Sequence, residues 1–163
     1  MSISIEQLHS SDYPVIRKIF QEGIDSGLAT FETNAPDWQE WDRRFWNECR
    51  IVARSNSQIV GWGSLSDVSR REVYRGVKED TVYVSRDHHG KGIGRLILSE
   101  LVTRSEALGV WTLQAVMFPE NTASVSLHSS LGFREVGLRK NIGKLDGRWR
   151  DTLLMERRSS FGL

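Results

Sequence analysis

The chain has 163 residues, of which 39% are hydrophobic and 26% are charged, a composition typical of one globular domain spanning residues 1–163. A formal net charge of +1 gives no indication of a nucleic-acid partner, and a single cysteine excludes an internal disulfide or a cysteine zinc cluster. Because the sequence shows neither a signal peptide nor an apolar run near the ~20 residues of a membrane span, we expect a cytoplasmic protein without a membrane partner or a metal site.

The first half of the chain predicts a strand, two helices and a hairpin. Residues 2–8 alternate in polarity as a strand does, and Pro14 suits the first turn of a following helix. A loop at residues 28–33 leads to a second helix that begins near Asp37. Residues 50–54 and 58–65 read as the two strands of a hairpin. The residues expected to face inward are Val15, Ile16, Ile19 and Phe20 in the first helix and Trp38, Trp41 and Phe45 in the second.

The second half predicts strands at residues 79–85, 111–117, 133–143 and 148–156, with two helices between them. One helix begins at Ile93 and ends before Gly109, a natural C-cap. The other begins after Asn121, an N-cap candidate. The residues expected to be buried are Ile93, Leu96, Ile97, Leu101 and Leu108 in the former and Ala123, Val125, Leu127 and Leu131 in the latter.

The resulting order of elements, β-α-α-β-β-β-α-β-α-β-β, indicates the fold class. Successive strands without an intervening helix favour antiparallel pairing, whereas the strand-helix-strand crossover at residues 85–112 favours a parallel pair. We therefore expect an α/β fold (α+β by some schemes) with a mixed, mostly antiparallel central sheet and helices on both faces. A doubly wound dinucleotide-binding sheet does not fit this order.

The segment His89-Gly90-Lys91-Gly92-Ile93-Gly94 joins a predicted strand to a predicted helix through a glycine-rich turn. Such a turn leaves backbone N–H groups unpaired at a positively polarised helix N-terminus, and glycines allow a bulky anion to approach them. A diphosphate-bearing molecule is therefore the first hypothesis. The spacing excludes two nucleotide motifs, because Ser85 stands where a P-loop needs its first glycine and Ile97 where a dinucleotide fingerprint needs its third.

This segment resembles the pyrophosphate loop of the GNAT superfamily of N-acetyltransferases, whose pattern is Gln/Arg-x-x-Gly-x-Gly/Ala, with His89 in place of the usual Gln or Arg. Segments along most of the chain are similar to the phosphinothricin / methionine sulfoximine acetyltransferase branch of that superfamily. These segments are residues 28–33, 74–75 with 79–84, 121–124 with 127–133, and 147–151. The resemblance implies the GNAT (acyl-CoA N-acyltransferase) fold and an enzyme that moves the acetyl group of acetyl-CoA to the α-amine of a small amino acid or analogue.

The resemblance also implies roles for individual residues. Glu79 is the expected general base, and the backbone N–H of Val84 is the expected donor to the oxyanion. Coenzyme A is expected to contact Val82, Tyr83, Val84, His89, Gly90, Lys91, Gly92, Ile93, Gly94, Arg95 and Asn121. The amine acceptor is expected to contact Phe31, Glu32, Tyr74, Arg75 and Glu79, with Arg75 as a bidentate partner for a carboxylate.

Several alternatives stay open at this point. Either His128 or water could protonate the departing thiolate, and Asp80 could share the role of base with Glu79, although strand alternation points these two carboxylates to opposite faces. The acceptor could be methionine sulfoximine, methionine sulfone, phosphinothricin, a protein N-terminus or a lysine. A coenzyme A-binding module without turnover is a further alternative. The resemblance also implies a homodimer that uses the C-terminal hairpin.

Overall fold

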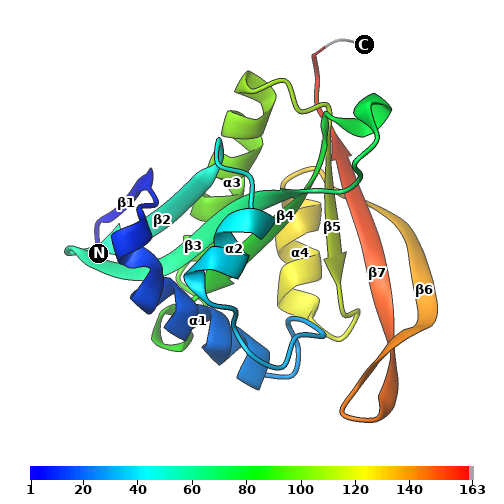
Figure 1. The fold of residues 1–163 in the computed structure, drawn as a ribbon, viewed down its shortest axis with the longest axis horizontal. Helices are drawn as coiled ribbons and strands as arrows, with labels where there is room; N and C mark the ends of the chain where they lie inside the picture. The colour runs from blue at the N-terminus through cyan, green and yellow to red at the C-terminus, as the bar shows by residue number, and fades with distance from the viewer. Residues whose placement is uncertain (162–163) are drawn as a thin grey trace.

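The computed structural model describes residues 1–161 and confirms the predicted order of strands and helices (Figure 1). The strands are β1 (Ile3–Gln7), β2 (Arg50–Ser55), β3 (Gln58–Asp67), β4 (Val77–Val84), β5 (Thr112–Met117), β6 (Arg134–Leu145) and β7 (Arg148–Arg158). The helices are α1 (Tyr13–Asp25), α2 (Trp38–Arg44), α3 (Ile93–Ala107) and α4 (Thr122–Ser130), with short 3-10 turns η1 (Ser10–Asp12), η2 (Glu72–Tyr74) and η3 (Arg86–His88). Within this described part of the chain, no helix combines the length and apolar character that crossing a membrane requires.

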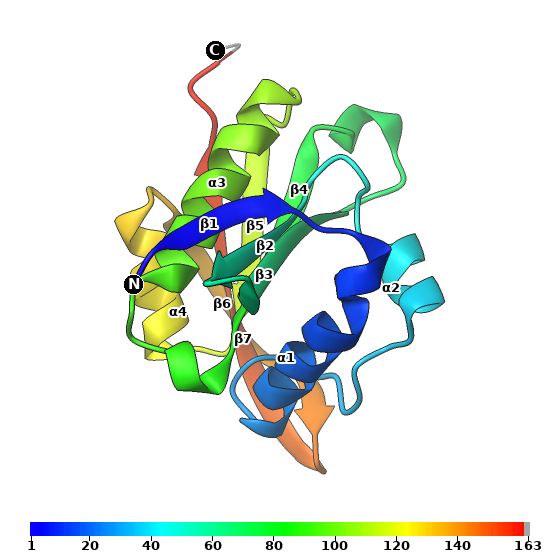
Figure 2. The same cartoon turned by 90° about the vertical axis from the view of Figure 1, so that its left-hand side faces the viewer.

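The strands form one mixed sheet in the order β1-β2-β3-β4-β5-β7-β6. The pair β4–β5, which the α3 crossover connects, is parallel, and the other neighbouring pairs are antiparallel, as the sequence predicts. Helices α1 and α2 lie on one face of the sheet, and α3 and α4 lie on the other (Figures 1 and 2). The fold-class prediction is therefore confirmed.

The face under α1 and α2 has an aromatic core. The Phe20 ring stacks on the Tyr83 ring with centroids 4.8 Å apart, and Tyr83 stacks on Trp62 at 5.3 Å. Gly23 of α1 lies directly against Tyr83, because a Cβ at this position would come within 2.4 Å of the ring. Such offset aromatic contacts add to the free energy gained from burial and fix the position of Tyr83 on β4.

The opposite core packs α3 and α4 onto the sheet, and here some predicted inward residues are wrong. Leu96 is 46% exposed because the buried stripe of α3 runs through Ile93, Ile97 and Leu101, which leaves Leu96 on the outer face. Leu108 is exposed because it follows the last residue of the helix. The other exposed residues that were expected to be buried are Val15 in α1 and Ala123 in α4.

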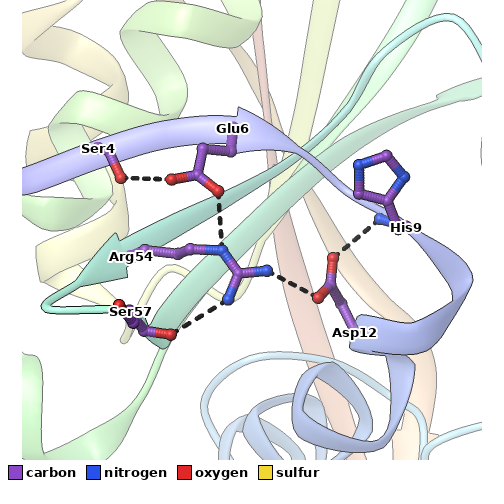
Figure 3. Close-up of polar contacts among 6 residues, drawn as sticks. All are labelled: Ser4, Glu6, His9, Asp12, Arg54 and Ser57. Carbon is purple, nitrogen blue, oxygen red and sulfur yellow. Dashed lines mark hydrogen bonds and ion pairs between the residues drawn. The ribbon is translucent and has the colours of Figure 1, made fainter.

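The Arg54 guanidinium ties the edge strand β1 and the entry to α1 to the hairpin β2–β3 (Figure 3). Its Nε donates to Glu6 on β1 at 2.9 Å, and its Nη2 donates to Asp12 at 2.7 Å. The third bond runs from Nη1 to the carbonyl of Ser57 in the hairpin turn at 3.2 Å. Arg54 thereby fixes β1 on β2 at an edge where no further strand could hold it.

Candidate active site

The strands β4 and β5 diverge after a short parallel contact. They pair only from Val77 to Glu79 on β4 and from Thr112 to Gln114 on β5, and beyond this point the strands splay apart (Figure 1). The bond from Ser85 N–H to the carbonyl of Val60 sets the alternation of the β3–β4 ladder. The N–H groups of Val82 and Val84 therefore point away from β3, into the gap that β5 leaves open.

A cleft of about 760 Å³ lies at this gap. Val82, Tyr83 and Val84 of β4 border one side, and Ala115 and Met117 of β5 border the other. The turn after β4, the start of α3, one side of α4 and the loop at residues 28–30 complete the wall. The cleft is thus open to the two faces of the sheet, because the missing strand pairing makes a hole between β4 and β5.

The glycine turn at the end of the cleft has the geometry of an anion site. Gly90 and Gly92 have φ angles of +73° and +78°, a left-handed backbone conformation that residues other than glycine rarely adopt. The first turn of α3 begins immediately afterwards at Ile93, so its backbone N–H groups have no acceptor within the helix. Ile93, Gly94 and Arg95 border the cleft together with His89, Gly90 and Gly92. This arrangement suits a diphosphate.

His89 and Lys91 of this turn have local partners. The Nε2–H of His89 donates to the carbonyl of Val84 at 2.8 Å, since a carbonyl oxygen can only accept. The side chain of His89 therefore ties the turn to the end of β4. Lys91 does not border the cleft, and its ammonium donates to the carbonyl of Asp87 at 2.9 Å.

Glu79 borders the cleft where β4 and β5 part. Its carboxylate accepts a 2.8 Å hydrogen bond from Nε2 of Gln114 on β5. Burial raises the pKa of Glu79, and the Gln114 hydrogen bond opposes that shift. A carboxylate with a raised pKa is a better proton acceptor near neutral pH than an ordinary surface glutamate.

Asp80 and His128 form a buried pair on the other face of β4, which the sequence did not predict. Nε2 of His128 lies 2.9 Å from Oδ1 of Asp80, and the two side chains are 5% and 3% exposed. Both residues border the cleft. The strand alternation that separates Glu79 from Asp80 was predicted, but the helix position that brings His128 to Asp80 has no local sequence signal.

Asn121 and Arg44 complete the polar wall of the cleft. Asn121 caps α4 as predicted, accepting from the N–H of Ser124 at 3.2 Å and donating to the carbonyl of Leu28 at 3.3 Å. Arg44, the last residue of α2, borders the cleft on the Glu79 side and forms an ion pair with Glu32. Arg44 has no sequence signal for a binding role, because neighbouring arginines at the end of a short helix usually mark a solvated surface.

Four residues expected to bind the acceptor, Phe31, Glu32, Tyr74 and Arg75, are not among the residues that border the cleft. Tyr74 is 44% exposed in η2, and Arg75 pairs with Glu72 at 3.3 Å and lies over the ring of Trp111. Neither Tyr74 nor Arg75 borders the cleft. Phe31 packs edge-to-face on Phe118 with centroids 4.9 Å apart and does not border the cleft either.

Comparison with known proteins agrees with this geometry. Residues 4–133 match the Acetyltransferase (GNAT) family, so the chain belongs to this family and is an acetyltransferase. The chain is similar to a phosphinothricin N-acetyltransferase of Alcaligenes faecalis, with 33% identity over 161 residues that cover 94% of this chain and 81% of that protein. It is also similar to an L-methionine sulfoximine/L-methionine sulfone acetyltransferase of Pseudomonas paraeruginosa, with 30% identity over 96% of this chain and 94% of that one.

One solved structure is also similar to this chain in both sequence and fold. The crystal structure of a phosphinothricin acetyltransferase from Sinorhizobium meliloti in complex with acetyl-CoA has a TM-score of 0.91 and 34% identity to this chain. The match covers 99% of this chain and 91% of that chain. The resemblance stated from the sequence and the expected GNAT fold are therefore confirmed.

The hydrogen bond from Gln114 sets how far the pKa of Glu79 rises. Substituting Gln114→Leu removes the interaction that lowers this pKa and leaves the burial that raises it, so the pKa of Glu79 should rise further. Titration of the glutamate carboxyl carbons by NMR measures the change. Gln58→Leu, at an exposed glutamine of β3, is the control and should leave the titration of Glu79 unaltered. An unchanged or lowered pKa of Glu79 in Gln114→Leu would contradict this account.

Proposed function

We propose that the enzyme transfers the acetyl group of acetyl-CoA to the α-amine of a small amino acid or analogue, with methionine sulfoximine, methionine sulfone and phosphinothricin as the first candidates. The observation that carries this proposal is one cleft that joins an amide-rich glycine turn to a carboxylate with a raised pKa. The acceptors named for the Alcaligenes and Pseudomonas relatives support the choice of substrate class.

The cleft has separate features for each part of coenzyme A. The diphosphate fits the turn at Gly90 and Gly92, where the N-terminus of α3 contributes partial positive charge. The pantetheine arm fits the gap beside β4, where the free N–H groups of Val82 and Val84 can pair with its amides as a neighbouring strand would. Asn121 stands at the opposite wall and supplies a side-chain amide.

The chemistry follows from the position of Glu79. An α-amine has a pKa of about 8 and is largely protonated at neutral pH, so a proton must leave before the amine can attack. Glu79 takes that proton, directly or through water. The amine nitrogen then bonds to the thioester carbon, and the N–H of Val84 donates to the oxygen that becomes negative. The carbon–sulfur bond breaks as the carbonyl re-forms, and coenzyme A leaves as a thiolate.

Arg44 is better placed than Arg75 to bind the carboxylate of the acceptor, because only Arg44 borders the cleft. Its guanidinium borders the cleft on the same side as Glu79, and the Arg44 charge lies close enough to oppose the raised pKa of Glu79. The pair with Glu32 holds the Arg44 side chain in place while other N–H donors of the guanidinium remain for a ligand. An acceptor with an α-carboxylate would therefore place its amine near Glu79 when the carboxylate binds Arg44.

The other readings of the sequence make different predictions. A protein N-terminal or lysine acetyltransferase would prefer peptides to free amino acids, and a non-catalytic module would bind coenzyme A without releasing thiol. The expected homodimer stays a prediction. Val136, Leu138, Ile142 and Trp149 of the β6–β7 hairpin are exposed and apolar, which supports contact with a second copy there.

Release of free thiol from acetyl-CoA tests the proposed function. The wild-type enzyme should acetylate at least one of the three candidate amino acids faster than it acetylates peptides. Glu79→Gln should lower the rate about 100-fold, and most strongly at low pH, where unassisted amine is scarce. Glu48→Gln, at an exposed glutamate, is the control. Absence of thiol release with all three acceptors would remove the substrate assignment, and an unaltered pH profile in Glu79→Gln would remove Glu79 as the base.

Recognition of the carboxylate by Arg44 is tested with a matched pair of variants. Arg44→Gln should raise the KM of the amino-acid acceptor about 10- to 100-fold, because a charge-assisted hydrogen bond is worth about 1.5–3 kcal/mol. Arg43→Gln removes the exposed neighbouring charge and should leave this KM within about twofold. With an acceptor amine that lacks the carboxylate, wild type and Arg44→Gln should have the same KM. An equal loss with both acceptors would show that Arg44 does not bind the carboxylate.

A further inference from the structure

The loop between α1 and α2 crosses the cleft from one wall to the other. Its residues 27–32 form a strap, which leaves α1 on one face of the sheet and runs beside the start of α4 on the other (Figures 1 and 2). Leu28, Ala29 and Thr30 of the strap border the cleft. The position of the strap therefore decides how much space a ligand finds where β4 and β5 part.

Two side chains from the far wall hold the first half of the strap. Nη1 of Arg150, on β7, donates to the carbonyl of Gly27 at 3.2 Å. Nδ2 of Asn121, the cap of α4, donates to the carbonyl of Leu28 at 3.3 Å. Both donors come from the β5 side of the gap, whereas the strap comes from α1 on the β4 side. The two hydrogen bonds therefore hold the strap across the cleft.

The guanidinium of Arg150 is itself fixed in place. Its central carbon lies 3.8 Å from the centroid of the Phe118 ring, and its Nη2 lies 3.6 Å from the carboxylate of Glu120. The Arg150 side chain is only 20% exposed, and a cation over an aromatic face is held more firmly where little water surrounds it. Arg150 does not border the cleft, so it acts on a ligand only through the strap.

A ring contact and an ion pair hold the second half of the strap. Phe31 packs edge-to-face on Phe118 with centroids 4.9 Å apart, so the ring that supports the guanidinium also supports the strap. Phe31 also lies against Gly143 of β6, where a Cβ would come within 3.0 Å of its ring. At the end of the strap, Glu32 pairs with Arg44. The strap is thus tied to the hairpin at one end and to α2 at the other.

The strap borders the part of the cleft that the acceptor is expected to use. Glu79 and Tyr83 lie on the same face of β4, because residues an even number apart share a face. Ala29 lies beside this face, since a Cβ on Gly23 would come within 2.4 Å of the Tyr83 ring and 3.7 Å of the Ala29 side chain. An acceptor with its amine at Glu79 and its carboxylate at Arg44 therefore has the strap as the wall beside its side chain.

We propose that Arg150 is a positioning residue for acceptor selectivity: it latches the strap across the cleft, and the latched strap limits the acceptor to a slender side chain. This inference rests on the proposed acetyl transfer and narrows the class of acceptor. Amino acids such as methionine sulfone fit beside the latched strap. A bulky aromatic side chain such as that of tryptophan fits only when the strap moves outward, and this movement breaks the hydrogen bond of Arg150.

A slender and a bulky acceptor together test the latch. In wild type, kcat/KM should be about 100-fold higher for the fastest of the three candidate amino acids than for tryptophan. In Arg150→Gln this ratio should fall about 10-fold, mainly through a lower KM for tryptophan, because the loosened strap yields to the larger ring. The KM of acetyl-CoA should stay within about twofold. Arg148→Gln, at an exposed arginine of the same strand, is the control and should keep the wild-type ratio.

A second variant loosens the strap without altering Arg150. In Gly143→Ala the added methyl group pushes on the Phe31 ring, so the strap should leave its seat on the hairpin and the selectivity ratio should again fall. Gly137→Ala, on the same strand, is the control, because a Cβ at this position meets no atom within 4 Å.

Backbone 15N relaxation measures the motion of the strap directly. In wild type and in Arg148→Gln, the order parameters of residues 28–30 should be near 0.85, about the value of a rigid backbone. In Arg150→Gln they should fall below about 0.6, the range of a flexible loop. A merely structural role of Arg150 elsewhere in the hairpin would leave them unchanged.

The outcomes distinguish this inference from the proposed function. A lower selectivity ratio and lower order parameters in Arg150→Gln, with neither in Arg148→Gln, support the latch. An unchanged ratio in Arg150→Gln, or a wild type that acetylates tryptophan as efficiently as the slender acceptor, would overturn the inference while acetyl transfer stands. If Arg150→Gln does not fold, an unchanged ratio in Gly143→Ala overturns it instead. A wild-type enzyme that acetylates no amino acid would defeat the proposed function, and with it any selectivity of the strap.

Discussion

The early end of the pairing between β4 and β5 is the constraint on which the rest of the site depends. Backbone N–H and C=O groups inside a protein need hydrogen-bond partners, and a sheet normally supplies them without interruption. Here the ladder stops at Glu79 and Gln114, and the strands separate where the sheet is covered on both faces. The N–H groups of Val82 and Val84 are therefore available for a ligand in the middle of the sheet, at a depth where loops rarely place them.

The same splay explains why two adjacent residues can have opposite chemistry. Glu79 and Asp80 follow each other on β4, yet their side chains lie on different faces of the sheet. Glu79 accepts a hydrogen bond from an amide, and burial raises its pKa, whereas the Asp80 carboxylate lies 2.9 Å from the His128 imidazole. Because the gap opens to both faces, a molecule lying in it contacts both environments at once. A closed sheet would separate these two side chains completely.

Much of the fold was predictable from periodicity and turn residues. The alternation of strands, the glycine turn before Ile93 and the caps at Asn121 and Gly109 are local signals, and the structure has each of them. The errors concern side chains whose burial is decided by tertiary packing. Leu96 is apolar like a core residue but lies on the outer face of α3, and Leu108 lies just past the end of that helix.

Among the residues that border the cleft, those on β4 and the following turn have local sequence signals, whereas those from other elements, the cap Asn121 apart, have none. The glycine turn and Glu79 follow from one continuous stretch of sequence, so local spacing was sufficient to find them. Arg44 comes from a helix 35 residues earlier, and His128 reaches Asp80 from 48 residues later, so only the folded chain brings them to the cleft. Arg75 is close to Glu79 in sequence but does not border the cleft, and its expected role as a clamp stays a prediction.

Amide hydrogen exchange with and without coenzyme A tests the central claim most directly, because the claim concerns backbone N–H groups. The free N–H groups of Val82 and Val84 and those of residues 90–95 should exchange fast in the protein alone and become protected when coenzyme A is added. The amides of β1, at the far edge of the sheet, should exchange at the same rate in both samples. Unchanged exchange at β4 and at the glycine turn under saturating coenzyme A would contradict the account.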